Sequence, residues 1–206
     1  MTKAVFLDKD GTLIENVPYN VDPGKIKLYP GAGLALRRLQ EQGFKIIVVS
    51  NQSGVGRGLF EESALNVVWK EIAAKLMEYR VAIDNFYYCP HYKEGNIEGL
   101  NIECDCRKPL PGMLEKAARE HDIDLKQSWM IGDILNDVEA GNRAGCKTIL
   151  INNGNETEWQ NGAFRTPDFF ATSILESAII IDNNLNWNKP ESKRKKALAT
   201  DPFEMA

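Results

Sequence analysis

The sequence lacks both an excess of basic residues and any long apolar run. Its 25 lysines and arginines are outnumbered by 29 aspartates and glutamates, for a formal net charge of -4. A sequence-independent nucleic-acid binder needs a basic face, so we expect no nucleic-acid partner. No apolar run approaches the roughly 18 residues of a membrane span, and Asp8 interrupts the first run below signal-peptide length. We therefore expect a cytoplasmic protein with no membrane partner. Separately, we expect a monomer.

Cysteine and histidine are also scarce, at four and two residues. In an intracellular chain, so few cysteines are expected to be thiols or metal ligands rather than disulfides. Four of these six residues nevertheless lie close together, as Cys89-x-His91 and Cys104-x-Cys106. Three thiolates and one imidazole form the closed tetrahedral set that structural zinc prefers. The clustering favours a structural zinc site over a surface histidine beside reduced thiols.

The segment between these candidate ligands would be ordered by the metal. Residues 92–103 are polar and contain glycine, with too few apolar residues to fold by themselves. A bound metal ion explains how such a segment is held in one conformation. Because Arg107 and Lys108 follow Cys106 directly, we expect this zinc loop to hold both cations in place.

Short apolar runs alternate with helix-length segments along the chain. Strands are expected at 4–8, 45–51, 86–89, 129–133 and 148–152, and helices at 31–43, 61–80, 111–121 and 137–145. Continuous apolar strands are typical of a parallel sheet covered on both faces. The alternating order predicts an α/β fold with a doubly wound parallel sheet. We expect one domain over residues 1–182 and a polar C-terminal extension over residues 183–206.

Polar side chains end three of the expected strands. Asp8 and Asp10 follow the first, Ser50 and Asn51 close the second, and Asp133 closes the fourth. In open α/β sheets the ligand crevice lies beyond the carboxyl ends of the strands, so these side chains should converge. Each alone is also a common cap or turn residue. Together, carboxylates that would repel one another predict a hard divalent cation such as Mg²⁺.

Carboxylates on Mg²⁺ beside a lysine are suited to phosphoryl transfer, in which positioning and charge neutralisation supply most of the rate. Asp8 is the expected nucleophile, and Asp10 is the expected general acid and base. Ser50 can donate to a phosphate oxygen, with Asn51 beside it at the phosphate. Lys108 can neutralise charge on the transferring group.

These residues also resemble a known set of motifs. The stretches "DKDGT" (8–12) and "GDILND" (132–137), with Ser50 and Lys108 between them, match in order the four motifs of the haloacid-dehalogenase-like (HAD) phosphatases. Three further stretches resemble the D-glycero-D-manno-heptose 1,7-bisphosphate 7-phosphatases, with the histidinol-phosphate phosphatases as close relatives. They are "YPG" (29–31), "SNQSGVGRG" (50–58) and "CPHYKEGNIEGLNIECDCRKP" (89–109).

The resemblance implies a HAD-like Rossmannoid fold and two metals. Mg²⁺ would be held by Asp8, the backbone carbonyl of Asp10 and Asp133, with Asp137 as a supporting carboxylate. The same resemblance implies structural zinc on the four candidate ligands named above. The stretches between motifs are helix-length or belong to the zinc loop, so we expect no large cap domain. Loops 15–20 and 52–58 and the zinc loop would then set specificity.

One position departs from the family pattern. Many heptose phosphatases of this kind carry a basic, substrate-contacting residue after the motif-four aspartate, whereas this chain has Ile134. Arg57 or Arg107 is expected to compensate by binding phosphate.

We therefore expect a Mg²⁺-dependent phosphomonoesterase that hydrolyses a small sugar bisphosphate through an aspartyl-phosphate intermediate. The resemblance implies that this substrate is D-glycero-D-manno-heptose 1,7-bisphosphate, converted to the 1-phosphate. Histidinol phosphate is the nearest alternative substrate, although "NQSG" at 51–54 replaces the "NQDG" common in those relatives. A polynucleotide 3'-phosphatase is less favoured, because no aromatic-studded basic groove is evident. From another class, the chain could be a zinc-stapled binding module with a vestigial phosphatase site.

Overall fold

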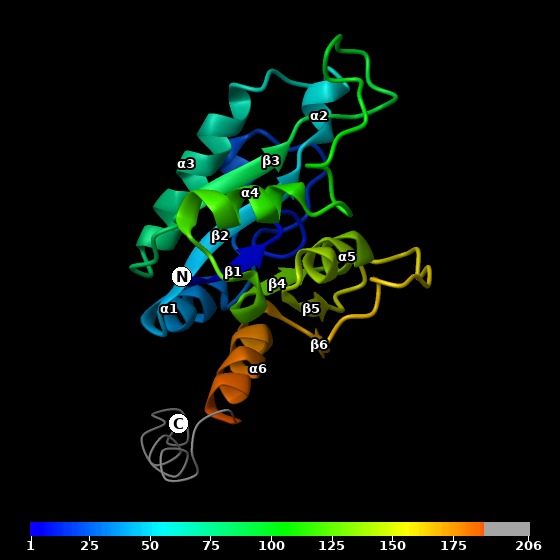
Figure 1. Cartoon of the computed structure of the whole chain (residues 1–206). Helices are drawn as coiled ribbons and strands as arrows, with labels where there is room; N and C mark the ends of the chain where they lie inside the picture. The colour runs from blue at the N-terminus through cyan, green and yellow to red at the C-terminus, as the bar shows by residue number, and fades with distance from the viewer. Residues whose placement is uncertain (188–206) are drawn as a thin grey trace.

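A six-stranded parallel sheet forms the centre of the computed structural model, which describes residues 1–187 (Figure 1). The strands lie in the order β3-β2-β1-β4-β5-β6, and every neighbouring pair is parallel. Their bounds are β1 Lys3–Leu7, β2 Phe44–Asn51, β3 Asn85–Cys89, β4 Trp129–Gly132, β5 Lys147–Ile151 and β6 Phe169–Ala171.

Helices cover both faces of the sheet. They are α1 Ala32–Glu41, α2 Ser53–Gly56, α3 Ala64–Met77, α4 Gly112–His121, α5 Leu135–Ala144 and α6 Ile174–Trp187, with short 3-10 helices η1 Pro23–Lys25 and η2 Leu125–Gln127. The side chains of Val5 and Leu7 pack toward α1, α3 and α6. Those of Ala4 and Phe6 pack toward α4 and α5. Because successive strand residues point to opposite faces, a strand buried on both sides must be apolar throughout.

The connections reverse direction beside β1. From β1 the chain proceeds through β2 to β3 on one side, and from β4 through β5 to β6 on the other. Leu7 is in register with Val48 of β2 and Ile131 of β4, so the three parallel strands end at the same edge of the sheet, with β2 extending to Asn51. Such a switch point is where doubly wound sheets bind ligands. The fold therefore brings the polar residues after β1, β2 and β4 to one crevice.

The expected fold class is confirmed, and each predicted strand lies within one residue of the observed bounds at either end. Apart from the crossover helices α1 and α4 and the short 3-10 helices, the described connections after β1 and β3 are irregular backbone, so they form no large cap domain. No helix within residues 1–187 is long and apolar enough to cross a bilayer.

Besides the two short 3-10 helices, one strand and two α-helices were not predicted: α2, β6 and α6. The first two span only four and three residues, too few to show a period. Helix α6 continues to Trp187, five residues beyond the expected domain end, because Leu185 packs against the core despite the asparagines around it. The rest of the expected extension, residues 188–206, lies outside the described residues.

Candidate active site

The chain turns sharply after β1, which presents Asp8 to the crevice. The backbone N–H of Asp8 still donates to the carbonyl oxygen of Ile131, so the residue is fixed by the sheet. Gly11 then adopts φ +88°, a left-handed conformation that glycine tolerates best. A Cβ at Gly11 would lie 2.0 Å from Oδ2 of Asp133. The turn can therefore approach Asp133 only because this position is glycine.

Lys108 lies buried between two carboxylates. Its Nζ is 2.5 Å from Oδ1 of Asp8, 2.6 Å from Oδ1 of Asp137 and 2.9 Å from the carbonyl oxygen of Val49. Burial alone would lower the pKa of Lys108, but the charges of Asp137 and then Asp8 more than offset it and raise the pKa. Lys108 is therefore a permanent cation in contact with the predicted nucleophile.

The side chain of Asn51 forms two hydrogen bonds with the backbone of Lys108. Its Nδ2 donates to the carbonyl oxygen of Lys108 and its Oδ1 accepts from the N–H of Lys108, both at 3.0 Å. The sequence predicted a phosphate-binding role for Asn51 but gave no signal for this pairing, which joins positions 57 residues apart.

Three buried carboxylates offer a divalent-cation site. Oxygen atoms of Asp8, Asp133 and Asp137 all lie within 4.8 Å of one another. Burial, followed by the charges of Asp8 and Asp137, raises the pKa of Asp133 to about 8. Burial also raises the pKa of Asp137 to about 6, against the opposing charge of Lys108. A hard cation would reduce the repulsion between these crowded, desolvated carboxylates, so the oxygen donors present fit Mg²⁺.

Asp10 stands beside this cluster, held by two side chains. Nζ of Lys9 is 2.7 Å from its Oδ1, and Nε2 of Gln52 is 3.3 Å from its Oδ2. Burial raises the pKa of Asp10, with the charge of Lys9 opposing this shift. Gln52 also donates to Oγ of Ser50 at 2.7 Å. It thus links two predicted site residues, a role that the sequence did not predict.

Two adjoining cavities lie at this edge of the sheet. The first, of about 210 Å³, is lined by Asp8, Asp10, Asn16, Ser50, Asn51, Lys108, Asp133, Ile134 and Asn155. The second, of about 200 Å³, is lined by residues 9–10, 16–20 and 51–54. Asp10, Asn16 and Asn51 line both, so the second cavity opens beside the reactive carboxylates. Loops 15–20 and 52–58 were predicted to set specificity, and parts of both line it.

Neither predicted arginine lines these two cavities. The guanidinium carbon of Arg57 lies 3.6 Å from the ring centroid of Tyr92 and 5.9 Å from that of Tyr19. Nη1 of Arg107 donates to the carbonyl oxygen of His91 at 3.3 Å. Both cations thus contact the zinc loop, and Arg57 connects it to loop 15–20.

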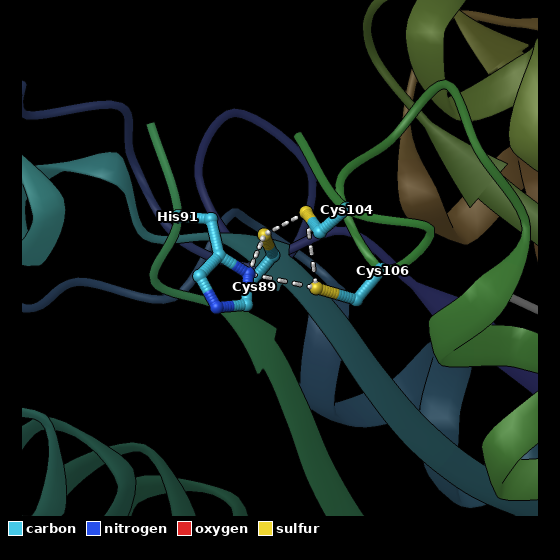
Figure 2. A group of neighbouring side chains, drawn as sticks. All are labelled: Cys89, His91, Cys104 and Cys106. Atoms are coloured by element: carbon cyan, nitrogen blue, oxygen red, sulfur yellow. Dashed lines mark hydrogen bonds between the residues drawn. The ribbon is translucent and has the colours of Figure 1, made fainter. Parts of the chain in front are cut away.

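Cys89, His91, Cys104 and Cys106 come together at the end of β3, as the sequence predicted (Figure 2). Figure 2 shows the three sulfurs and Nδ1 of His91 directed toward a common centre. The S···S distances are 3.5 Å for Cys89 to Cys104 and 3.4 Å for Cys104 to Cys106. Nδ1 lies 3.6 Å from the Cys89 sulfur and 3.2 Å from the Cys106 sulfur.

These distances are close to the edges of a tetrahedral zinc site. Zn–S bonds of roughly 2.3 Å imply S···S edges of about 3.8 Å. Burial raises the pKa of Cys104, and a hydrogen bond with Cys89, followed by burial, raises the pKa of Cys106. A cation would displace these thiol protons, since zinc binds thiolates. The donor set therefore fits structural zinc.

Comparison with known proteins identifies the family of this chain. A family model described as HAD-hydrolase-like matches residues 105–177, which include Lys108, Asp133 and Asp137. A D-glycero-beta-D-manno-heptose-1,7-bisphosphate 7-phosphatase from Haemophilus ducreyi is 42% identical over 160 residues, covering 74% of this chain and 84% of the relative. The protein of that name from Escherichia coli is 38% identical over 152 residues, covering 73% and 80%. This chain belongs to the heptose-bisphosphate phosphatase family of HAD-like hydrolases.

A solved structure supports the same placement. The D,D-heptose 1,7-bisphosphate phosphatase from B. bronchiseptica, complexed with magnesium and phosphate, superposes with a TM-score of 0.75 and 30% identity. The match covers 88% of this chain and 99% of that one. The resemblance inferred from the sequence motifs is therefore confirmed at the level of the HAD-like phosphatase family.

Proposed function

We propose that this protein is a Mg²⁺-dependent phosphomonoesterase that converts D-glycero-D-manno-heptose 1,7-bisphosphate to the 1-phosphate. The observation that carries the proposal is the buried Asp8–Lys108–Asp137 arrangement beside Asp133, in a chain 42% identical to a phosphatase of that name. Clustered carboxylates beside a fixed cation are suited to stabilising a transferring phosphoryl group.

In the proposed reaction, a carboxylate oxygen of Asp8 attacks phosphorus and the bond to the sugar oxygen breaks. Asp10 donates its proton to that leaving oxygen, which is favoured by its raised pKa. Asp10 then accepts a proton from the water that attacks the aspartyl-phosphate. Inorganic phosphate leaves, and Asp8 returns to its carboxylate form.

Other residues hold this chemistry in place. Lys108 keeps Asp8 oriented and offsets negative charge, and Ser50 can donate to a phosphate oxygen. Mg²⁺, bound by Asp8, Asp133 and the backbone carbonyl of Asp10 with Asp137 in support, would neutralise charge on the phosphoryl oxygens. Zinc would hold the loop between Cys89 and Cys106 without contacting substrate.

The second cavity supports a sugar as the leaving group. Asn16, Asn20, Asn51, Gln52 and Tyr19 line it with neutral hydrogen-bonding groups. Its one lining cation, Lys9, is already bonded to Asp10 at 2.7 Å. Apart from the Lys9–Asp10 ion pair, the lining is uncharged and offers many donors and acceptors, which matches the hydroxyl groups of a sugar body.

Steady-state kinetics with Mg²⁺ would test this proposal. We expect the highest kcat/KM for the heptose bisphosphate among sugar bisphosphates, histidinol phosphate and p-nitrophenyl phosphate. ³¹P NMR should show loss of the 7-phosphate and retention of the 1-phosphate. A preference for histidinol phosphate would overturn the substrate. Absence of phosphate release from every ester would instead indicate a zinc-stapled binding module.

We also infer a monomeric, cytoplasmic enzyme. The four cysteines are free thiols in the structure, and thiolate-bound zinc suits a reducing compartment. Light scattering on the purified protein should give a mass near 23.1 kDa. A mass of twice that value would contradict the monomer.

A further inference from the structure

The connection from β5 to β6, residues 152–168, has neither helix nor strand and reaches the first cavity. In Figure 1 it is the yellow loop beside α5. Irregular connections of this length are uncommon in compact domains, and those that are ordered often carry function. Its far end is anchored on α5, because Nη1 of Arg165 lies 3.0 Å from Oδ1 of Asn136 and 2.9 Å from Oε2 of Glu139.

The near end of the loop contacts three parts of the catalytic crevice. Nδ2 of Asn153 donates to the carbonyl oxygen of Gly11 at 2.7 Å. Oε2 of Glu156 accepts from the N–H of Leu135, at the start of α5, at 2.6 Å. Between them, Nδ2 of Asn155 donates to Oδ2 of Asp133 at 2.7 Å. The two flanking bonds therefore hold Asn155 against the carboxylate.

We propose that Asn155 is a positioning residue for the Mg²⁺ ligand Asp133, an inference that rests on the proposed function. Each carboxylate oxygen of Asp133 accepts one neutral donor: Thr12 Oγ1 on Oδ1 at 3.0 Å, and Asn155 on Oδ2. Two such bonds fix the plane of the carboxylate. Neither neutralises its charge, so the group stays available to a cation.

The packing leaves little freedom for this arrangement. A Cβ on Gly11 would lie 2.0 Å from Oδ2 of Asp133 and 2.6 Å from Nδ2 of Asn155. The turn after Asp8, the Asp133 carboxylate and the Asn155 amide thus meet at one point. Without the Asn155 amide, the Asp133 carboxylate would lose the hydrogen bond on Oδ2 and could rotate away from the metal position.

Metal binding without substrate would test this inference. Mn²⁺ binding would be measured by electron paramagnetic resonance for the wild type, Asn155→Ala and Asn155→Leu, which removes the donor at similar volume. Loss of a group that orients a metal ligand typically weakens affinity by about 10- to 100-fold. We expect that loss in both variants, with a matching rise in the Mg²⁺ concentration needed for half-maximal activity and a smaller change in kcat at saturating Mg²⁺.

Asn152→Ala is the matched control, because Asn152 is an exposed asparagine of the same loop outside both cavities. Its Mn²⁺ affinity should equal that of the wild type. Unchanged Mn²⁺ affinity in both Asn155 variants would overturn the inference, even if their melting temperatures fell. If the wild type bound no Mn²⁺, the proposed magnesium site itself would fail.

Discussion

Asn51 and Lys108 form a closed pair in which one carboxamide both donates to and accepts from the backbone of the other residue, at 3.0 Å each way. Asn51 is the last residue of β2, so the pair connects Lys108 to the rigid sheet. The position of Lys108 therefore does not depend on the zinc loop alone.

Removing this pairing should lower catalysis more than substrate binding. In Asn51→Ala the backbone of Lys108 loses both bonds, and a displacement of about 1 Å in a catalytic group can cost on the order of 10²-fold in rate. We expect a fall of that size in kcat for p-nitrophenyl phosphate. Asn51→Asp retains the acceptor for the Lys108 N–H and should fall less. Equal losses in both variants would argue against the pairing as the cause.

Asp8 and Asp10 should differ in how completely their loss stops turnover. Asp8→Asn removes the nucleophile, so no aspartyl-phosphate can form and phosphate release should cease. Asp10→Asn removes proton transfer, which typically contributes about 10² to 10⁴. Phosphate release is the measurement, with circular dichroism to confirm the fold. Near-normal turnover by Asp8→Asn would refute its assignment.

The metal-free protein should lose stability as pH rises. The folded pKa of Asp133 is about 8 against an ordinary value of 3.8, so the folded state holds a proton that the unfolded state releases. This stabilising contribution is complete below about pH 4 and is lost as pH rises through 8. Mg²⁺ replaces the proton, so the Mg²⁺-induced rise in melting temperature should be larger at pH 8.5 than at pH 5.5. Asp133→Asn should remove this difference, and a pH-independent Mg²⁺ effect in the wild type would contradict it.

A change in the lining of the second cavity should lower kcat/KM for sugar substrates selectively. Tyr19→Ala changes its lining without touching Asp8 or Asp10, so kcat/KM should fall for the heptose bisphosphate and stay close to wild type for p-nitrophenyl phosphate. Val67→Ala alters an exposed apolar side chain of α3 and should affect neither substrate. Equal losses for both substrates would show that Tyr19 supports the catalytic centre instead.

The sequence predicted those site residues whose placement follows from strand order. Asp8, Ser50 and Asp133 end parallel strands, which must finish at one edge of the sheet, and the zinc ligands stand out because cysteine and histidine are rare. Asn155 and the Asn51–Lys108 pair could not be predicted. Asparagine is common in loops, so neither residue stands out in the sequence. Asn155 lies 22 residues from Asp133, and Asn51 lies 57 residues from Lys108, so both contacts depend on the packed fold.

Loss of zinc should loosen the contacts that connect the zinc loop to the second cavity while leaving Lys108 in place. Cys104→Ser removes one of four ligands and should release the metal. Lys108 remains held by Asn51, Asp8, Asp137 and the carbonyl oxygen of Val49. The zinc loop instead supports Tyr92, on which Arg57 stacks while also approaching Tyr19 of the second cavity. We therefore expect a raised KM for the heptose bisphosphate, a small change in kcat for p-nitrophenyl phosphate, and faster proteolysis within residues 92–103.

Cys146→Ser is the control for this prediction, because Cys146 is a buried thiol outside the metal cluster. That variant should keep about one zinc per chain by elemental analysis, as the wild type should, since a closed set of four ligands holds one ion. An active wild type without zinc would refute the site. Equal losses of activity on the heptose bisphosphate and on p-nitrophenyl phosphate in a zinc-free Cys104→Ser protein would show that Lys108 is displaced. The zinc loop would then contribute more to the position of Lys108 than the hydrogen bonds from Asn51 do.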